Sequence, residues 1–82
     1  MKDDRGLYYH PFPHNKLVRM YVRETGGGIS FRLWKKDEPE LWEEHGWVPY
    51  DAINEAADTY EGNFDPRRAY DIDVARTLLR ED

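Results

Sequence analysis

The sequence predicts a small α+β fold: an antiparallel β-hairpin, or a three-stranded sheet built on it, packed on one face by two or three short helices. Three observations carry this prediction. Hydrophobicity alternates with period 2 over residues 17–36, apolar residues recur at helical spacing over residues 50–61, and a capped apolar stripe follows Asp71. We expect one domain over residues 1–82, and a chain this short buries only about 60% of its unfolded surface.

The hairpin of residues 17–36 has an apolar side on both of its runs. That side is formed by Val18, Met20, Val22, Ile29, Phe31 and Leu33. The runs flank Gly26-Gly27, and glycine readily adopts the positive φ that tight hairpin turns require. A two-residue turn at this point pairs Val22 with Phe31, which keeps the whole apolar set on one face of the sheet.

The opposite side of the hairpin is basic and aromatic, and we treat it as the candidate binding face. It carries Arg19, Tyr21, Arg23, Arg32 and Trp34. The same register sets Tyr21 opposite Arg32 and Arg19 opposite Trp34, where each guanidinium can lie over a ring. Arginine, tryptophan and tyrosine dominate binding energy at protein interfaces, so this face is suited to a partner.

The charge distribution separates the hairpin from the rest of the chain. The formal net charge is -5, but residues 16–36 carry six basic residues against Glu24 alone, whereas residues 37–82 carry fourteen acids against four arginines. The basic hairpin and the acidic remainder complement each other within one fold or across a dimer, or the hairpin face binds an acidic partner.

The helical region is expected over residues 39–81. A first helix is predicted from Pro39 to His45, followed by Gly46 as its stop, because proline suits the first helical position. An extended link through Pro49 leads to a second helix from Tyr50 to Glu61, whose Ile53, Ala56, Ala57 and Tyr60 form an apolar stripe.

A connector over residues 62–70 precedes the last predicted helix. Asp71 is expected to cap that helix, because its carboxylate can accept hydrogen bonds from the first free backbone N–H groups. The inward-facing positions are Ile72, Val74, Ala75, Leu78 and Leu79.

Residues 1–15 are expected to form an irregular arm or to contribute a third strand over residues 7–10. Pro11 and Pro13 exclude a regular helix there. Because a two-stranded hairpin is marginal by itself, a second copy could supply the missing strand instead. We therefore expect a homodimer that pairs strand edges or stacks its Trp34 and Tyr21 faces.

The sequence predicts no catalytic residue, cofactor or metal. His10 and His14 have the spacing of two metal ligands on a helix, but Pro11 and Pro13 prevent that helix. His45 suits the negative end of a helix without further chemistry. Gly26-Gly27-Gly28 joins two strands and lacks the lysine of a phosphate-binding loop, so it indicates a turn.

The predicted function is that of a small, non-enzymatic, cytoplasmic interaction or regulatory module that self-associates through the hairpin. An acidic protein is the other expected partner, and no membrane partner is expected, since the chain has no long apolar stretch. Two alternatives stay open. Single-stranded nucleic acid could stack on the hairpin face, although a pI near 5.1 disfavours it, and a small enzyme or enzyme subunit ranks last.

Overall fold

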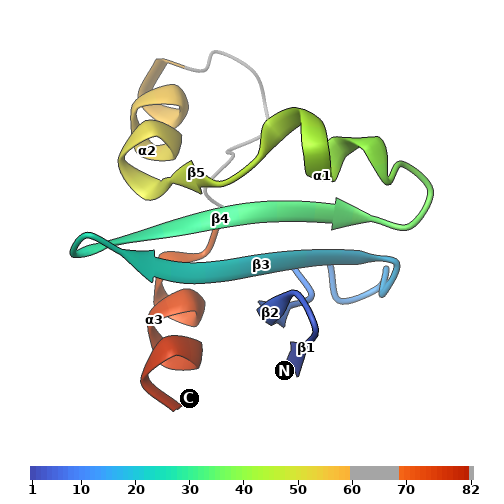
Figure 1. Ribbon diagram of the computed structural model, residues 1–82. Coiled ribbons are helices and arrows are strands. Elements are labelled where there is room, and N and C mark those ends of the chain that lie inside the picture. The colour runs from blue at the N-terminus through green and yellow to red at the C-terminus, as the bar shows by residue number, and fades with distance from the viewer. Residues whose placement is uncertain (60–68, 82) are drawn as a thin grey trace.

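The computed structural model describes residues 1–59 and 69–81, which form an antiparallel sheet with three helices. The described strands follow each other in the order β1-β2-β3-β4-β5 (Figure 1). Their bounds are Lys2–Asp3, Gly6–Tyr9, Val18–Thr25, Gly28–Lys35 and Val48–Pro49. Helices α1, α2 and α3 span Glu40–His45, Tyr50–Thr59 and Ile72–Glu81. The α+β prediction is confirmed, and the sheet is larger than the predicted two or three strands.

The predicted hairpin is present as β3 and β4 with the predicted register. Val22 pairs with Phe31, Met20 with Leu33, Tyr21 with Arg32 and Arg19 with Trp34. Gly26 and Gly27 form the turn with φ values of 57° and 82°, a region that side chains rarely tolerate. The alternation of apolar residues and the two turn glycines are therefore enough to set the register of β3 against β4.

The N-terminal residues extend the sheet rather than forming an irregular arm. Strand β2 pairs with β3 through Leu7 opposite Val22 and Tyr9 opposite Met20, and β1 adds two more paired residues beyond it. The third strand is thus supplied by the same chain, so the hairpin does not need a second copy to complete its sheet. At the other edge, Val48 of β5 lies opposite Phe31.

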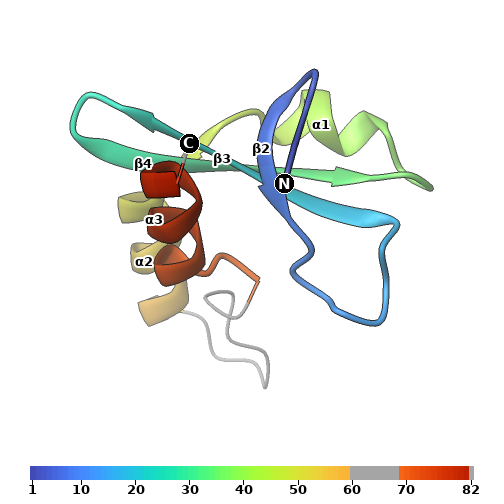
Figure 2. The ribbon, with the colours of Figure 1, turned by 90° about the horizontal axis from the view of Figure 1, so that it is seen from below.

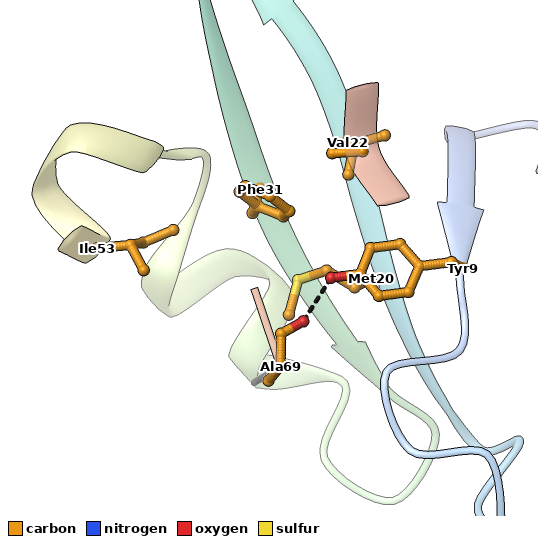
Figure 3. Close-up of a cluster of buried hydrophobic side chains, with 7 residues drawn as sticks. Tyr9, Met20, Val22, Phe31, Ile53 and Ala69 are labelled. Carbon is orange, nitrogen blue, oxygen red and sulfur yellow. Dashed lines mark hydrogen bonds between the residues drawn. The ribbon is translucent and has the colours of Figure 1, made fainter. Parts of the chain in front are cut away.

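The helices lie on both faces of the sheet, which corrects the expectation that they pack on one. Viewed along the sheet, α2 and α3 lie on one side and α1 on the other (Figure 2). The side of α2 and α3 contains the main hydrophobic core, formed by Tyr9, Met20, Val22, Phe31, Ile53, Ala69 and Ala75 (Figure 3). Met20 and Phe31 are fully buried there. The rings of Tyr50 and Tyr70 lie 6.0 and 5.6 Å from that of Phe31.

The ends of the helices largely follow the predicted signals. The Asp71 carboxylate accepts hydrogen bonds from the backbone N–H groups of Asp73 and Val74 at 3.0 and 3.2 Å, so the predicted cap of α3 is confirmed. Helix α1 begins one residue after Pro39 and is followed by Gly46. The last two residues of the predicted second helix and most of the connector, residues 60–68, lie outside the described residues.

Tyr9 joins the N-terminal strand to the start of α3. Its hydroxyl donates a hydrogen bond to the carbonyl of Ala69 (Figure 3). It also accepts one from the Asp71 backbone N–H at 2.9 Å. Burial raises the pKa of this phenol well above its ordinary value, so the hydroxyl keeps its proton to donate. One side chain therefore holds together segments about sixty positions apart in the chain.

Candidate functional site

The five predicted site residues lie together on the α1 side of the sheet. They are joined there by residues from β2, α1, the N-terminal turn and the link between α1 and β5. We call the combined surface the aromatic-arginine face, formed by Arg5, Tyr8, Arg19, Tyr21, Arg23, Arg32, Trp34, Trp42 and Trp47. Sequence reasoning identified only the residues that the hairpin itself contributes.

Tyr21 lies at the centre of this face and is fully buried, so the expectation that it faces outward is wrong. The Tyr8 ring of β2 lies 5.3 Å from it, and the Trp42 ring of α1 contacts it edge-on at 5.1 Å. Trp47 extends the row, 6.2 Å from Trp42. The chain itself thus covers the middle of the hairpin face, and Tyr21 cannot stack on a second copy.

Arg19 and Arg32 each lie over an aromatic ring. Arg19 has the partner that the register predicted, and Arg32 has a different one. Arg19 lies over Trp34 at 4.9 Å, as the register predicted, and also over Tyr8 at 4.7 Å. Arg32 instead lies over Trp42 at 3.9 Å, and its Nε donates a 2.8 Å hydrogen bond to the Trp42 carbonyl. The register opposed Arg32 to Tyr21, but α1 presents a larger ring together with a backbone acceptor.

Asp3 is the one carboxylate bound at the centre of the described face. It accepts hydrogen bonds from the Tyr21 hydroxyl, from Arg19 Nη1 at 2.9 Å and from the Arg5 backbone N–H at 2.8 Å. Burial by itself would raise the pKa of Asp3, but these hydrogen bonds and the charges of Arg19 and Arg5 outweigh it and hold the pKa below its ordinary value. No sequence signal marked Asp3, because its partners are brought to it only by the pairing of β1 with β2 and of β2 with β3.

Two arginines remain exposed at the ends of the face. Arg23 lies over the Trp47 ring at 4.3 Å, and Arg5 lies 5.7 Å from the Trp34 ring and 6.0 Å from that of Trp42. Arg19 has Asp3 as its ion-pair partner, and Arg32 has Glu43 at 3.8 Å. Within the described residues, by contrast, no carboxylate lies within ion-pair distance of the Arg5 or Arg23 guanidinium.

The three histidines considered as metal ligands or helix-end charges do not come together. His10 forms a 3.2 Å hydrogen bond with the Val18 carbonyl, while His14 and His45 are exposed. The described part of the chain contains no group of three histidines, aspartates or glutamates placed to hold a metal ion. Over residues 1–59 and 69–81, no helix is long and apolar enough to cross a membrane.

The aromatic-arginine face can bind anions at its two exposed guanidiniums and apolar groups at its half-buried tryptophans. No protein-family model matches the chain, and searches of curated proteins and of solved structures found no significant match.

Proposed function

We propose that the chain is a non-enzymatic binding module whose aromatic-arginine face binds an acidic segment of another protein. The observation that carries the proposal is the pair of exposed guanidiniums, Arg5 and Arg23, each held against a tryptophan and with no carboxylate within ion-pair distance in the described structure. Such groups can accept a partner's carboxylate without first giving up an internal ion pair.

The stacking supports binding because it limits the conformations that each arginine must lose. An arginine loses side-chain entropy when it is ordered at an interface, and a guanidinium already lying over a ring has lost part of it before the partner arrives. Its fork of N–H donors then matches a carboxylate in two-point geometry. The half-buried rings of Trp34, Trp42 and Trp47 supply apolar contact beside these charges.

Charge and the covered ring faces favour an acidic protein over the other two expected partners. Two copies meeting through this face around a two-fold axis would place arginines near arginines, a repulsive arrangement. A single nucleic-acid strand would need open ring faces for its bases, but the rings of Trp34, Trp42 and Trp47 already have guanidiniums over them.

The test is a titration of intrinsic tryptophan fluorescence with a short peptide rich in glutamate and leucine. We expect binding by the wild type and a loss of about 30-fold or more in the Arg5→Ala/Arg23→Ala double variant, because hot-spot arginines contribute about 2 kcal/mol or more. The matched control is Lys16→Ala/Lys36→Ala, which removes the same charge from exposed positions outside this face.

Two results would contradict the proposal. An equal loss in the lysine control would show attraction by overall charge alone. Salt-sensitive quenching by a thymidine oligonucleotide, without any response to the peptide, would favour nucleic-acid binding instead.

A further inference from the structure

A groove lies at the turn end of the hairpin, on the opposite side of the sheet from the aromatic-arginine face. It consists of two adjoining hollows of about 220 and 350 Å³ that share Glu24, Ile29 and Arg76. The groove separates the end of β3 and β4 from α2 and α3. We call it the hairpin-end groove.

The hairpin extends past its neighbouring strands at this groove. Strand β2 pairs with β3 only from Met20 to Val22, and β5 pairs with β4 only at Ser30 and Phe31. The last residues before the turn therefore project beyond the described sheet, as Figure 1 shows at the end of β3 and β4 next to the turn. An exposed two-stranded projection of this kind is available to another chain.

The walls of the groove carry charges of both signs above apolar residues. Ile29, Tyr50, Ile72 and Leu79 are half-buried and supply the apolar part. The acids are Glu24 and Asp51, and the bases are Arg76 and Arg80. Among the described residues, no ion pair joins these acids to these arginines, and Arg76 has only a distant contact with Asp73 at 3.9 Å.

We infer that the hairpin-end groove is the surface through which two copies of this chain associate around a two-fold axis. In such an interface the same surface meets itself, and an axis that passes between the acids and the arginines sets the acids of one copy opposite the arginines of the other. A strongly acidic partner would oppose Glu24 and Asp51, and a strongly basic one would oppose Arg76 and Arg80. Only a partner with charges of both signs complements the groove, and a second copy of the chain carries the same set of charges.

This association is independent of the acidic partner proposed above, because the two surfaces lie on opposite sides of the sheet. The hairpin-end groove includes neither the strand edges nor the Trp34 and Tyr21 faces, through which the sequence predicted a dimer. Either proposal can therefore fail while the other holds.

The test uses charge reversal and mixing of two variants. Glu24→Arg gives a copy with a base at both position 24 and position 76. Arg76→Glu gives a copy with an acid at both positions. Alone, each should raise the dimer dissociation constant about tenfold or more, because like charges then face each other twice across the axis. Mixed together, they should form a heterodimer at close to wild-type affinity, since both contacts regain opposite charges.

Mass measured by light scattering and analytical ultracentrifugation reads out the result, with the wild type expected at about twice the 9.8 kDa of one chain. Glu44→Arg, an exposed reversal on α1, is the control and should dimerise like the wild type. Circular dichroism checks folding, and Glu24→Gln and Arg76→Gln replace any reversal that loses helix. For that neutral pair we expect smaller increases in the dissociation constant, and mixing should restore one of the two ion pairs and so give a partial rescue.

Several outcomes would overturn the inference. A wild type that is monomeric in solution is one such outcome, whether the groove is then empty or binds only a small zwitterion. Variants that dimerise as well as the wild type are another. Reversals that weaken the dimer but are not rescued by mixing would place the contact elsewhere.

Discussion

The two faces of the sheet are built from the same strands but are held by different forces. On the side of α2 and α3, Met20 and Phe31 are fully buried among apolar groups. On the side of α1, Tyr21 is equally buried, but its surroundings are tryptophans, guanidiniums and the Asp3 carboxylate. The first face is stabilised by dispersion and the hydrophobic effect, and the second by cation-ring contacts and a charged hydrogen-bond cluster.

The difference shows how a chain with few aliphatic residues can cover both sides of a sheet. Arg19 and Arg32 could be taken from composition as free positive charge, yet they form the packing over Tyr8, Trp34 and Trp42. Basic residues that alternate with rings along a strand can thus form a second, partly hydrated layer. Only the arginines at the ends of that layer, Arg5 and Arg23, remain exposed.

The largest expected effect comes from removing a ring on the main core side. Phe31→Ala should lower the free energy of unfolding by about 3–5 kcal/mol, because it leaves a cavity among fully buried groups. Urea denaturation followed by circular dichroism measures this loss. Trp42→Ala, on the other side, should cost less, because Trp42 is only half-buried. Equal losses would show that the two faces do not differ as described.

The next effect concerns the hydroxyl that joins β2 to α3. Tyr9→Phe should lower the free energy of unfolding by about 1–3 kcal/mol, because it leaves the Ala69 carbonyl and the Asp71 N–H without their buried partner. Thermal unfolding measures the change. Tyr8→Phe is the control on the aromatic-arginine face and should be nearly silent, because a phenylalanine ring still stacks under Arg19. A silent Tyr9→Phe would contradict the role given to that hydroxyl.

A smaller and pH-dependent effect is expected at Asp3. Its pKa is lower in the folded protein than in the unfolded chain, so its contribution is complete above the ordinary aspartate pKa and is lost as the pH falls through the folded value. Asp3→Asn should therefore cost about 1–2 kcal/mol at neutral pH, since it replaces charged hydrogen bonds by neutral ones. The difference from the wild type should vanish in strong acid.

Urea titrations at neutral pH and below the ordinary aspartate pKa separate this effect from general acid denaturation. Asp4→Asn, an exposed neighbour, is the matched control and should follow the wild type at every pH. A cost for Asp3→Asn that does not change with pH would assign Asp3 a steric role instead.

The smallest effect is expected at the exposed end of the aromatic-arginine face. Arg23→Ala should lower the free energy of unfolding by about 0.5–1 kcal/mol, the usual contribution of an exposed cation over a ring. The Trp47 emission maximum should shift to longer wavelength as its ring loses cover. A loss above about 2 kcal/mol would place Arg23 among the residues that hold the fold together, outside the range of an exposed pair.

Much of the fold could be predicted because its signals are local. Alternation over β3 and β4 with Gly26-Gly27 between them set the register, and Asp71 marked the start of α3. The N-terminal strands were harder to predict, because prolines, charges and tyrosines give no clean period over residues 1–15. Strand β5 has only two residues, too few for any pattern to show.

The candidate site was predicted only in the part that the hairpin contributes. Register placed Arg19 opposite Trp34, and the stacked pair is present. No pattern could place Asp3 against Tyr21, since the two are 18 positions apart and meet only when β1 and β2 join the sheet. The pairing of Arg32 with Trp42 likewise depends on where α1 settles after the end of β4.

The sequence by itself therefore determined which residues share a face, because the side-chain period of a strand and the glycines of its turn are local properties. Only the tertiary structure decided what lies over each face, because this depends on contacts between distant segments. Each of these contacts contributes little free energy by itself. For this protein that decision turned most of a basic, aromatic surface into an internal layer and left Arg5 and Arg23 exposed at its ends.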